Sequence, residues 1–154
     1  MDEVFLRING RLQYLWRAID QDGDVIDILV QPRRDRRAAE RFFRRLLRGQ
    51  GQEPLRIITD RLRSYSAAIR TGFCKVAHTT ERYANNRMEA SHQATRQRER
   101  QMRRFKSIRQ AQRFLSLQGV VHNLFRLGRH LIRSENYRFF RSRSFSMWRT
   151  VTAV

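Results

Sequence analysis

The sequence is poor in several kinds of residue, and each shortage excludes a class of protein. A single cysteine, Cys74, excludes a disulfide bond within the chain and suits the reducing cytoplasm. No stretch approaches 18 consecutive apolar residues, so we expect no transmembrane helix and no membrane partner. The chain starts Met1-Asp2-Glu3, without the basic and apolar regions of a signal peptide, and we therefore expect a cytoplasmic location.

Acidic residues and lysine are also scarce. The chain has 33 Lys and Arg residues against 14 Asp and Glu, a net charge of +19, and its only lysines are Lys75 and Lys106. Residues 1–60 are almost balanced, with 12 cations and 10 acids, whereas residues 94–154 carry 15 cations and two acids. This excess predicts a polyanionic partner, most simply nucleic acid, since the planar guanidinium group suits phosphate. The 154 residues, 40% of them hydrophobic, are enough for one domain with a packed core.

The first thirty residues have the pattern of three antiparallel strands. Residues 4–8, 12–19 and 25–30 are rich in β-branched and aromatic side chains. Asn9-Gly10 separates the first two runs and is the strongest short signal for a hairpin, because both central positions of a type I′ turn need positive φ. Residues 21–24 form the next turn.

The remaining patterns predict mostly helices. Asp35 is a suitable N-cap for a helix with an apolar face at residues 38–47, which Gly49 and Gly51 would end. Residues 55–59 resemble a short buried strand, residues 62–70 a helix that Gly72 ends, and residues 74–79 a fifth strand. From about residue 84 the pattern is helical almost to the end, with a weaker basic and aromatic helix or tail at residues 134–149.

The resulting order of three strands, helix, strand, helix, strand and helix is that of a ribonuclease-H-like α/β fold. We expect a mixed sheet of about five strands, with extra helices at the C-terminus. The predicted domain comprises residues 1–130, and residues 131–154 form a basic C-terminal helix or tail.

Because acids are scarce, their positions are informative. Asp60 follows a predicted buried strand, where it could bind a metal or cap the next helix. Glu89 begins a helical face that continues with His92, Arg96 and Arg100; the alternative is a solvated helix with pairs such as Glu99–Arg103. Asp2 lies in the first strand beside Glu3, or in a frayed terminus. Cys74 and His78 have the spacing of zinc ligands, but no second pair completes a structural site.

These residues carry a resemblance to a known family. The stretch from Tyr83 to His92 has the form Asn-Asn-x-x-Glu-x-x-His at its core, and Arg98-Glu99-Arg100 and Phe105-Lys106-Ser107 follow it. This stretch resembles the catalytic-glutamate helix of DDE transposases of the IS-six type of bacterial insertion sequence. The similarity extends in the same order over about residues 2–130, including Thr59-Asp60 with Ser64-Tyr65.

The resemblance implies a catalytic domain in which Asp2, Asp60 and Glu89 hold two Mg²⁺ ions, with Mn²⁺ as a substitute. The implied reaction is metal-dependent DNA strand cleavage and strand transfer during transposition. The implied partners are double-stranded DNA, at the element ends and the target, and further copies of the chain, in the nucleoid of a bacterial cell. The residues expected near DNA are Asn85, Asn86, His92, Arg96, Arg100, Arg103 and Lys106.

Family members also carry an N-terminal helix-turn-helix region, for which no residues precede Asp2 except Met1. We therefore expect a truncated copy of the enzyme. Two alternatives remain open: a catalytically inactive remnant that only binds DNA, and a basic, non-enzymatic nucleic-acid-binding protein of ribosomal type. The three acids in their motif context count against the second alternative.

Overall fold

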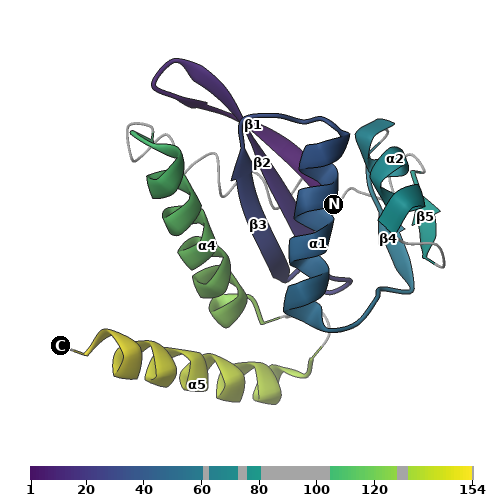
Figure 1. Ribbon diagram of the computed structural model, residues 1–154. Coiled ribbons are helices and arrows are strands. Elements are labelled where there is room, and N and C mark those ends of the chain that lie inside the picture. Colours follow the sequence, from purple (N-terminus) through teal and green to yellow (C-terminus); the bar gives the residue numbers. More distant parts are fainter. Residues whose placement is uncertain (61–62, 73–75, 81–104, 128–131, 154) are drawn as a thin grey trace.

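The computed structural model describes residues 1–60, 63–72, 76–80, 105–127 and 132–153, and of Asp2 only the backbone (Figure 1). The elements in chain order are β1 (Asp2–Ile8), β2 (Arg11–Ile19), β3 (Val25–Gln31), α1 (Arg36–Gln50), β4 (Arg56–Ile58), α2 (Arg63–Gly72), β5 (Ala77–Thr79), α4 (Ile108–Phe125) and α5 (Ser134–Thr152). The molecule is a mixed α/β protein. Strands β1, β2 and β3 form an antiparallel sheet in that order, and β4 pairs with β5 in parallel. The predicted order of elements is confirmed through the fifth strand. The expected single mixed sheet of about five strands is wrong for the described strands, which form one sheet of three and one of two; the start of β1 meets β4 through the Met1–Ile58 hydrogen bond rather than through a ladder.

The turn between β1 and β2 is the one that the sequence predicts. Asn9 and Gly10 have φ angles of 49° and 75°, and the ladder closes directly beside them, with Ile8 opposite Arg11. Asn and Gly adopt this left-handed region at little cost, which fixes the register of the hairpin. At the next turn the Asp20 side chain accepts hydrogen bonds from the backbone nitrogens of Asp22, at 2.9 Å, and Asp24, at 2.8 Å.

Helix α1 begins as predicted and ends within the predicted Gly49–Gly51 region. The Asp35 carboxylate accepts a hydrogen bond of 2.9 Å from the Ala38 nitrogen, which caps the helix. The helix continues through Gly49 to Gln50, and only Gly51 takes the left-handed conformation, with φ of 66°. Gly51 thus ends the helix as predicted, and Gly49, which the prediction also placed at the helix end, lies in its last turn.

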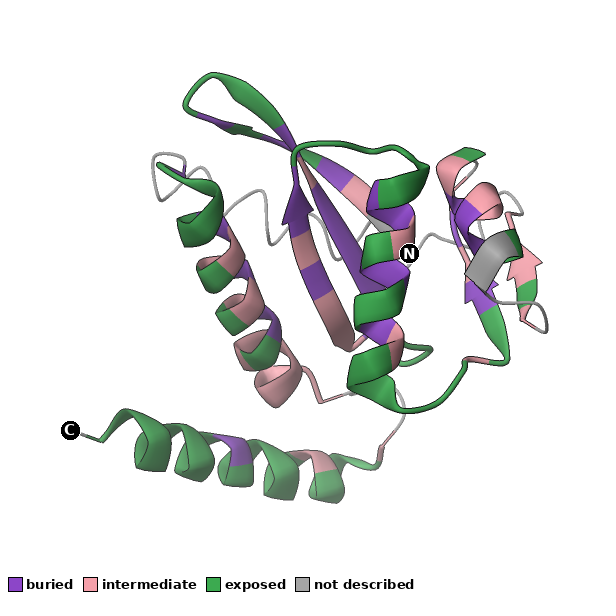
Figure 2. Ribbon diagram, viewed as in Figure 1, coloured by how far each residue is buried: buried purple, intermediate pink, exposed green. Residues whose placement is uncertain are grey.

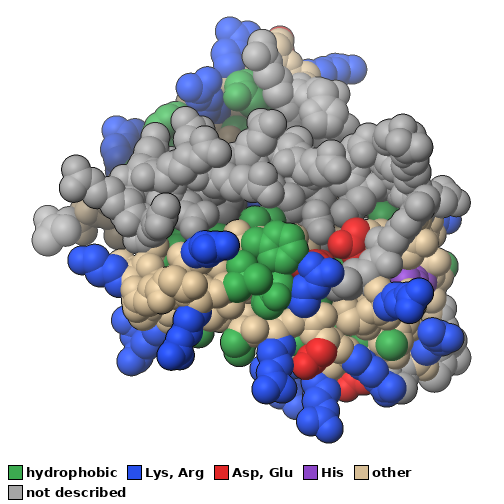
Figure 3. All heavy atoms as spheres, turned by 90° about the horizontal axis from the view of Figure 1, so that it is seen from above, with side chains coloured by type: hydrophobic (Ala, Val, Ile, Leu, Met, Phe, Trp, Pro, Cys, Tyr) green, Lys and Arg blue, Asp and Glu red, His purple; other side chains and the backbone are tan. Residues whose placement is uncertain are grey.

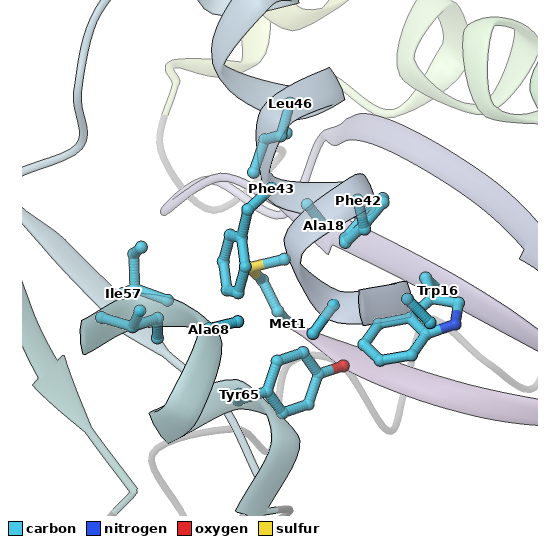
Figure 4. Close-up of a cluster of buried hydrophobic side chains, with 12 residues drawn as sticks. Met1, Trp16, Ala18, Phe42, Phe43, Leu46, Ile57, Tyr65 and Ala68 are labelled. Atoms are coloured by element: carbon cyan, nitrogen blue, oxygen red, sulfur yellow. The ribbon is translucent and has the colours of Figure 1, made fainter. Parts of the chain in front are cut away.

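Helices α1 and α4 cover opposite faces of the three-stranded sheet (Figures 1 and 2). Successive strand residues face opposite sides, and the sheet therefore contributes to two cores. In the first, Trp16 and Ala18 pack on the buried face of α1, on α2 and on Ile57 of β4 (Figure 4). In the second, strand residues including Val4 and Leu15 pack on the buried side of α4.

Side chains of α4 also complete the outer edge of the sheet. The Asn123 amide donates to the Val25 carbonyl and accepts from the Val25 nitrogen, both at 2.8 Å. The Gln112 amide likewise bonds the Val30 nitrogen and the Ile28 carbonyl, both at 2.8 Å. The exposed edge of β3 is thus covered by amide side chains, which removes a site for unwanted strand pairing.

The C-terminal region differs in one respect from the predicted nearly continuous helix. Residues 105–107 are not helical, Phe105 is buried, and Ser107 caps α4 by accepting from the Gln110 nitrogen at 3.0 Å. Helix α5 is continuous over its full length and almost wholly exposed. It contacts α4 mainly through aromatic rings, with 5.1 Å between the ring centroids of Phe125 and Phe145. Within the described ranges, no helix is long and apolar enough to cross a membrane.

A cluster of like charges lies between β2 and α4. Burial lowers the pKa of Arg17 to about 10, and the Arg126 guanidinium acts in the same direction. Arg126 in turn donates a hydrogen bond to the Gly23 carbonyl. Burial also lowers the pKa of His122, and both guanidinium groups act in the same direction, while Asp24 opposes them. We therefore expect His122 to be neutral near pH 7.

Helix α4 lies close to β3 at Gly119, which leaves little space for a side chain at this position. A Cβ atom at Gly119 would lie 3.2 Å from Val25 Cγ1 and 3.5 Å from Ile28 Cδ1, whereas one at Gly49 of α1 would meet nothing within 4 Å. We expect Gly119→Leu to lower the free energy of unfolding by about 1–3 kcal/mol, because the core becomes overpacked. The matched Gly49→Leu variant should raise it by about 0.5 kcal/mol through helix propensity. Urea unfolding measures both, and an equal effect at the two positions would contradict the close approach of helix and strand.

The lowered pKa of His122 makes stability depend on pH. As the pH falls below about 6.5, the unfolded chain binds a proton at His122 before the folded chain does. The contribution of neutral His122 to the free energy of unfolding is therefore fully present above pH 6.5 and is lost as the pH falls. We expect His122→Gln to lose less stability than the wild type between pH 7 and pH 5, as measured by urea unfolding at each pH. The loss of stability over the same pH range is compared with that of His78→Gln, because burial lowers the pKa of His78 as well. An unchanged loss in His122→Gln would refute the assignment.

Candidate active site

The start of β1 lies against the end of β4. The Met1 nitrogen donates a hydrogen bond of 2.6 Å to the Ile58 carbonyl, across 57 positions of sequence. Asp2 follows Met1 in the chain, and Asp60 is the second residue after Ile58. The backbone of the first expected acid and the strand that leads to the second therefore meet at one point of the molecule.

The third expected acid, Glu89, lies outside the described residues, and the Asp2 side chain is not described either. The convergence of Asp2, Asp60 and Glu89 thus stays a prediction. Among the side chains that are described, no three of His, Cys, Asp or Glu stand together as a metal-binding group. Residues 61 and 62 are not described, so the alternative role of Asp60 as a helix cap is also open.

The backbone leading to Asp60 is held by β5. Thr59 is buried, its nitrogen donates to the Thr79 carbonyl at 3.1 Å, and its hydroxyl donates to the Asp60 carbonyl at 2.8 Å. The same hydroxyl lies 2.8 Å from Nε2 of His78. Because a hydroxyl has one hydrogen to give, the His78 ring must donate in this second bond, which assigns its proton to Nε2. The half-buried Asp60 therefore follows a backbone fixed at several points.

Glu3 is a buried acid that stands out in the sequence only as the neighbour of Asp2. Its side chain is 4% exposed, it accepts a hydrogen bond of 3.1 Å from the Tyr65 hydroxyl, and its other oxygen lies 3.8 Å from Nη1 of Arg34. A usable signal is the period of two in a strand: Glu3 pairs opposite Trp16, which faces α1. A strand acid opposite a buried tryptophan predicts a buried carboxylate with a specific partner.

Arg17 is a second residue near the site that the sequence patterns did not single out. It is directly opposite Asp2 in the β1–β2 ladder, and only 4% of its surface is exposed. Arginine is rarely buried in this way unless charges or hydrogen bonds compensate it. The sequence offers a weak signal for it, since Arg17 stands between Trp16 and Ala18 in a predicted strand.

Of the residues expected near DNA, only Lys106 is described; Asn85, Asn86, His92, Arg96, Arg100 and Arg103 are not. Lys106 is exposed at the start of α4, where its carbonyl accepts a hydrogen bond of 2.7 Å from the Asn9 side chain of the hairpin turn. Figure 3 shows Lys and Arg side chains around the rim of one face of the molecule, with few acidic side chains among them. This distribution agrees with the surplus of cations in the sequence.

Comparison with known proteins shows the family. The family described as a DDE domain matches residues 1–127. The transposase for insertion sequence-like element IS431mec of Staphylococcus aureus strain Mu50 is 31% identical over 138 residues, which cover 84% of this chain and 58% of the relative. The transposase for insertion sequence element IS257 in transposon Tn4003 of the same species gives the same values. An uncharacterised protein of Yersinia pseudotuberculosis is 37% identical over 71 residues, 45% of this chain and 66% of that protein. No solved structure matches the chain.

The chain thus spans 58% of the length of the staphylococcal transposases that it resembles. The match to the DDE domain includes Asp2 and Asp60, the hairpin of β1 and β2, and the cores on both sides of the sheet. From the fold, from the contact between β1 and β4 and from these comparisons, we conclude that the chain belongs to the DDE-domain family of insertion-sequence transposases, of the IS-six type.

Proposed function

We propose that this chain is the catalytic domain of a transposase, with a ribonuclease-H-like fold, which cleaves DNA strands and transfers them to target DNA. Asp2, Asp60 and Glu89 are its metal-binding acids in this proposal. The observation that carries it is the hydrogen bond between Met1 and Ile58, because it brings the start of β1 to the end of β4. The family membership supplies the reaction type.

The chemistry of the proposed ligands fits magnesium. Mg²⁺ prefers carboxylate oxygens and leaves part of its coordination shell to water and phosphate. When bound, two such ions make the attacking oxygen more nucleophilic and stabilise the leaving oxygen of a phosphodiester. The carboxylates themselves hold the ions, and the fixed backbone around Thr59 limits how far Asp60 can move.

The basic surface has a separate role, which is to hold the DNA backbone. Arginines of α1 are partly neutralised by acids: Arg36 lies 2.7 Å from Glu40 and Arg45 lies 2.8 Å from Asp27. Among the residues that the structure describes, no acid forms an ion pair with the arginines of α5. These are Arg138, Arg141, Arg143 and Arg149. Charge that is not neutralised within the protein is available to phosphate, so we place part of the DNA path along α5.

The test of catalysis compares two single substitutions that each remove one negative charge. We expect the wild type to nick supercoiled plasmid DNA in the presence of Mg²⁺ or Mn²⁺. Asp60→Asn should lower the rate at least about 100-fold, because losing even the partners of metal ligands costs about 10–100-fold. Glu53→Gln, in an exposed loop, should leave the rate unchanged.

DNA binding, measured in the same samples by gel shift, should persist in both variants. If the wild type and Asp60→Asn both bind DNA and neither nicks it, the chain is a DNA-binding remnant and the catalytic proposal fails. If neither protein binds DNA, the nucleic-acid partner itself is refuted.

The proposed DNA path along α5 predicts a specific salt dependence. The triple variant Arg138→Gln, Arg143→Gln, Arg149→Gln should flatten the slope of log affinity against log salt concentration by about 0.9 for each phosphate that the variant no longer neutralises. The control triple variant Arg34→Gln, Arg36→Gln, Arg45→Gln removes the same charge from arginines that lie beside acids, and it should leave the slope near its wild-type value. Fluorescence anisotropy of a labelled duplex measures both. Equal flattening in the two variants would show diffuse binding and remove α5 from the path.

A further inference from the structure

Two hydrogen bonds join the chain segment that contains Asp2 to the chain segment that contains Asp60, one on each side of the two acids. One is the hydrogen bond from the Met1 nitrogen to the Ile58 carbonyl, and the other is the hydrogen bond from the Tyr65 hydroxyl to Glu3. Asp2 is the residue between Met1 and Glu3, and Asp60 lies between Ile58 and Tyr65. Each acid therefore belongs to a short segment that is tied at both ends to the segment of the other acid.

The stability of the fold alone does not explain a carboxylate at position 3. Its side chain is almost fully buried, and removing a carboxylate from water is costly. One of its contacts, Nη1 of Arg34 at 3.8 Å, comes from a half-exposed side chain that also lies over the Phe5 ring. Apolar side chains would fill the same space at lower cost, so a carboxylate here points to a need for a directional contact.

Tyr65 is well suited to provide such a contact. It is fully buried in α2, and its ring packs edge-on against Trp16, at 5.3 Å between centroids, and Phe43, at 6.1 Å. Figure 4 shows its hydroxyl directed away from Ile57 and Ala68 and toward the strand side of the cluster. A ring held on two sides keeps its hydroxyl at one position, so the bond to Glu3 fixes β1 relative to α2.

We propose that Glu3 is a positioning residue for DNA cleavage: its bond with Tyr65 holds β1 against α2 and thereby sets the spacing of Asp2 and Asp60. This inference rests on the proposed catalytic function. Glu3 contacts neither metal nor DNA in this scheme; it acts through Asp2, its neighbour in β1. The hydrogen bond between Met1 and Ile58 fixes the two segments on the other side of the acids. Together the two hydrogen bonds leave the segments little freedom to slide past one another.

The first test measures the spacing without any metal. In a Cys74→Ser background, Asp2→Cys and Asp60→Cys provide a pair of thiols; with a fixed concentration of an added disulfide oxidant, which accepts the two electrons, the rate of disulfide formation reports how often the two positions meet. Adding Tyr65→Phe, which removes one hydroxyl and keeps the ring, should slow cross-linking about 10-fold, the effect of losing one hydrogen bond to a charged group. Ile69→Val removes one methyl group from the same cluster and helix without touching Glu3, and it should leave the rate unchanged.

The second test uses the unmodified acids. Calorimetric titration with Mn²⁺ and the Mn²⁺ dependence of plasmid nicking should both shift to higher concentration, by about 10-fold, in Tyr65→Phe. Glu3→Leu should show the same shift, Glu3→Gln, which keeps an acceptor oxygen, should recover part of it, and Ile69→Val should show none. Circular dichroism confirms that each variant is folded at the temperature used.

The outcomes separate the two proposals. If the wild type neither binds Mn²⁺ nor nicks DNA, the catalytic proposal fails, while slower cross-linking in Tyr65→Phe still establishes the spacing role of Glu3. If Tyr65→Phe and Ile69→Val cross-link at equal rates, or if no cross-link forms in either, Glu3 does not set this spacing and the inference is overturned.

Discussion

The contact between the start of β1 and the end of β4 is the interaction on which the rest of the molecule depends. Strands β4 and β5 have three residues each, too few to form a stable sheet alone. They are held because Met1 bonds Ile58 and because Ile57, Tyr65 and other residues of this unit pack on Trp16 and α1. A parallel pair that would not persist by itself is thus held beside a stable antiparallel sheet as a separate two-stranded sheet.

The arginines of this chain have at least three different environments. Arg17 is buried beside α4, where desolvation lowers its pKa, and it contributes to the packing between sheet and helix. Arg36 and Arg45 are paired with acids on or near α1. The arginines of α5 are exposed on a helix that packs only lightly on the rest of the molecule. The net charge of +19 is therefore not one uniform property, and its unneutralised part is concentrated in the C-terminal half.

Local features of the fold could be predicted from the sequence, and long-range ones could not. Asn9-Gly10 and Asp35 determine a turn and a helix start through their own backbone and side-chain preferences, so both predictions are confirmed. The helix end at Gly51 is confirmed too, and Gly49 lies inside the last turn because glycine is tolerated in a helix at a small energetic cost. The non-helical conformation of residues 105–107 accompanies the burial of Phe105 in a core shared with β1 and β3, which no local pattern reveals.

The candidate site divides in the same way. Motif resemblance supplied Asp2, Asp60 and Glu89, because chemistry restricts which residues can stand at such positions. It did not supply Glu3 or Arg17, whose importance depends on what lies opposite them in the folded chain: Trp16 and Tyr65 for Glu3, and Asp2 and α4 for Arg17. Neighbouring residues of one strand face different cores, so Glu3 and Val4 belong to different environments although they are adjacent in sequence.

The acids and the residues around them affect the proposed site in different ways. In the proposed mechanism, substitution of a metal-binding acid removes a ligand directly, whereas the residues that join the two chain segments act through distance. A carboxylate pair that must share ions tolerates only small changes in separation, because carboxylate-to-magnesium distances are short and nearly fixed. The chain segments that carry the pair are joined at one point by the bond from the Met1 nitrogen to the Ile58 carbonyl and at another by the bond from Tyr65 of α2 to Glu3 of β1. In this proposal, geometry at the site depends on side chains in the core under α1 as well as on the acids themselves.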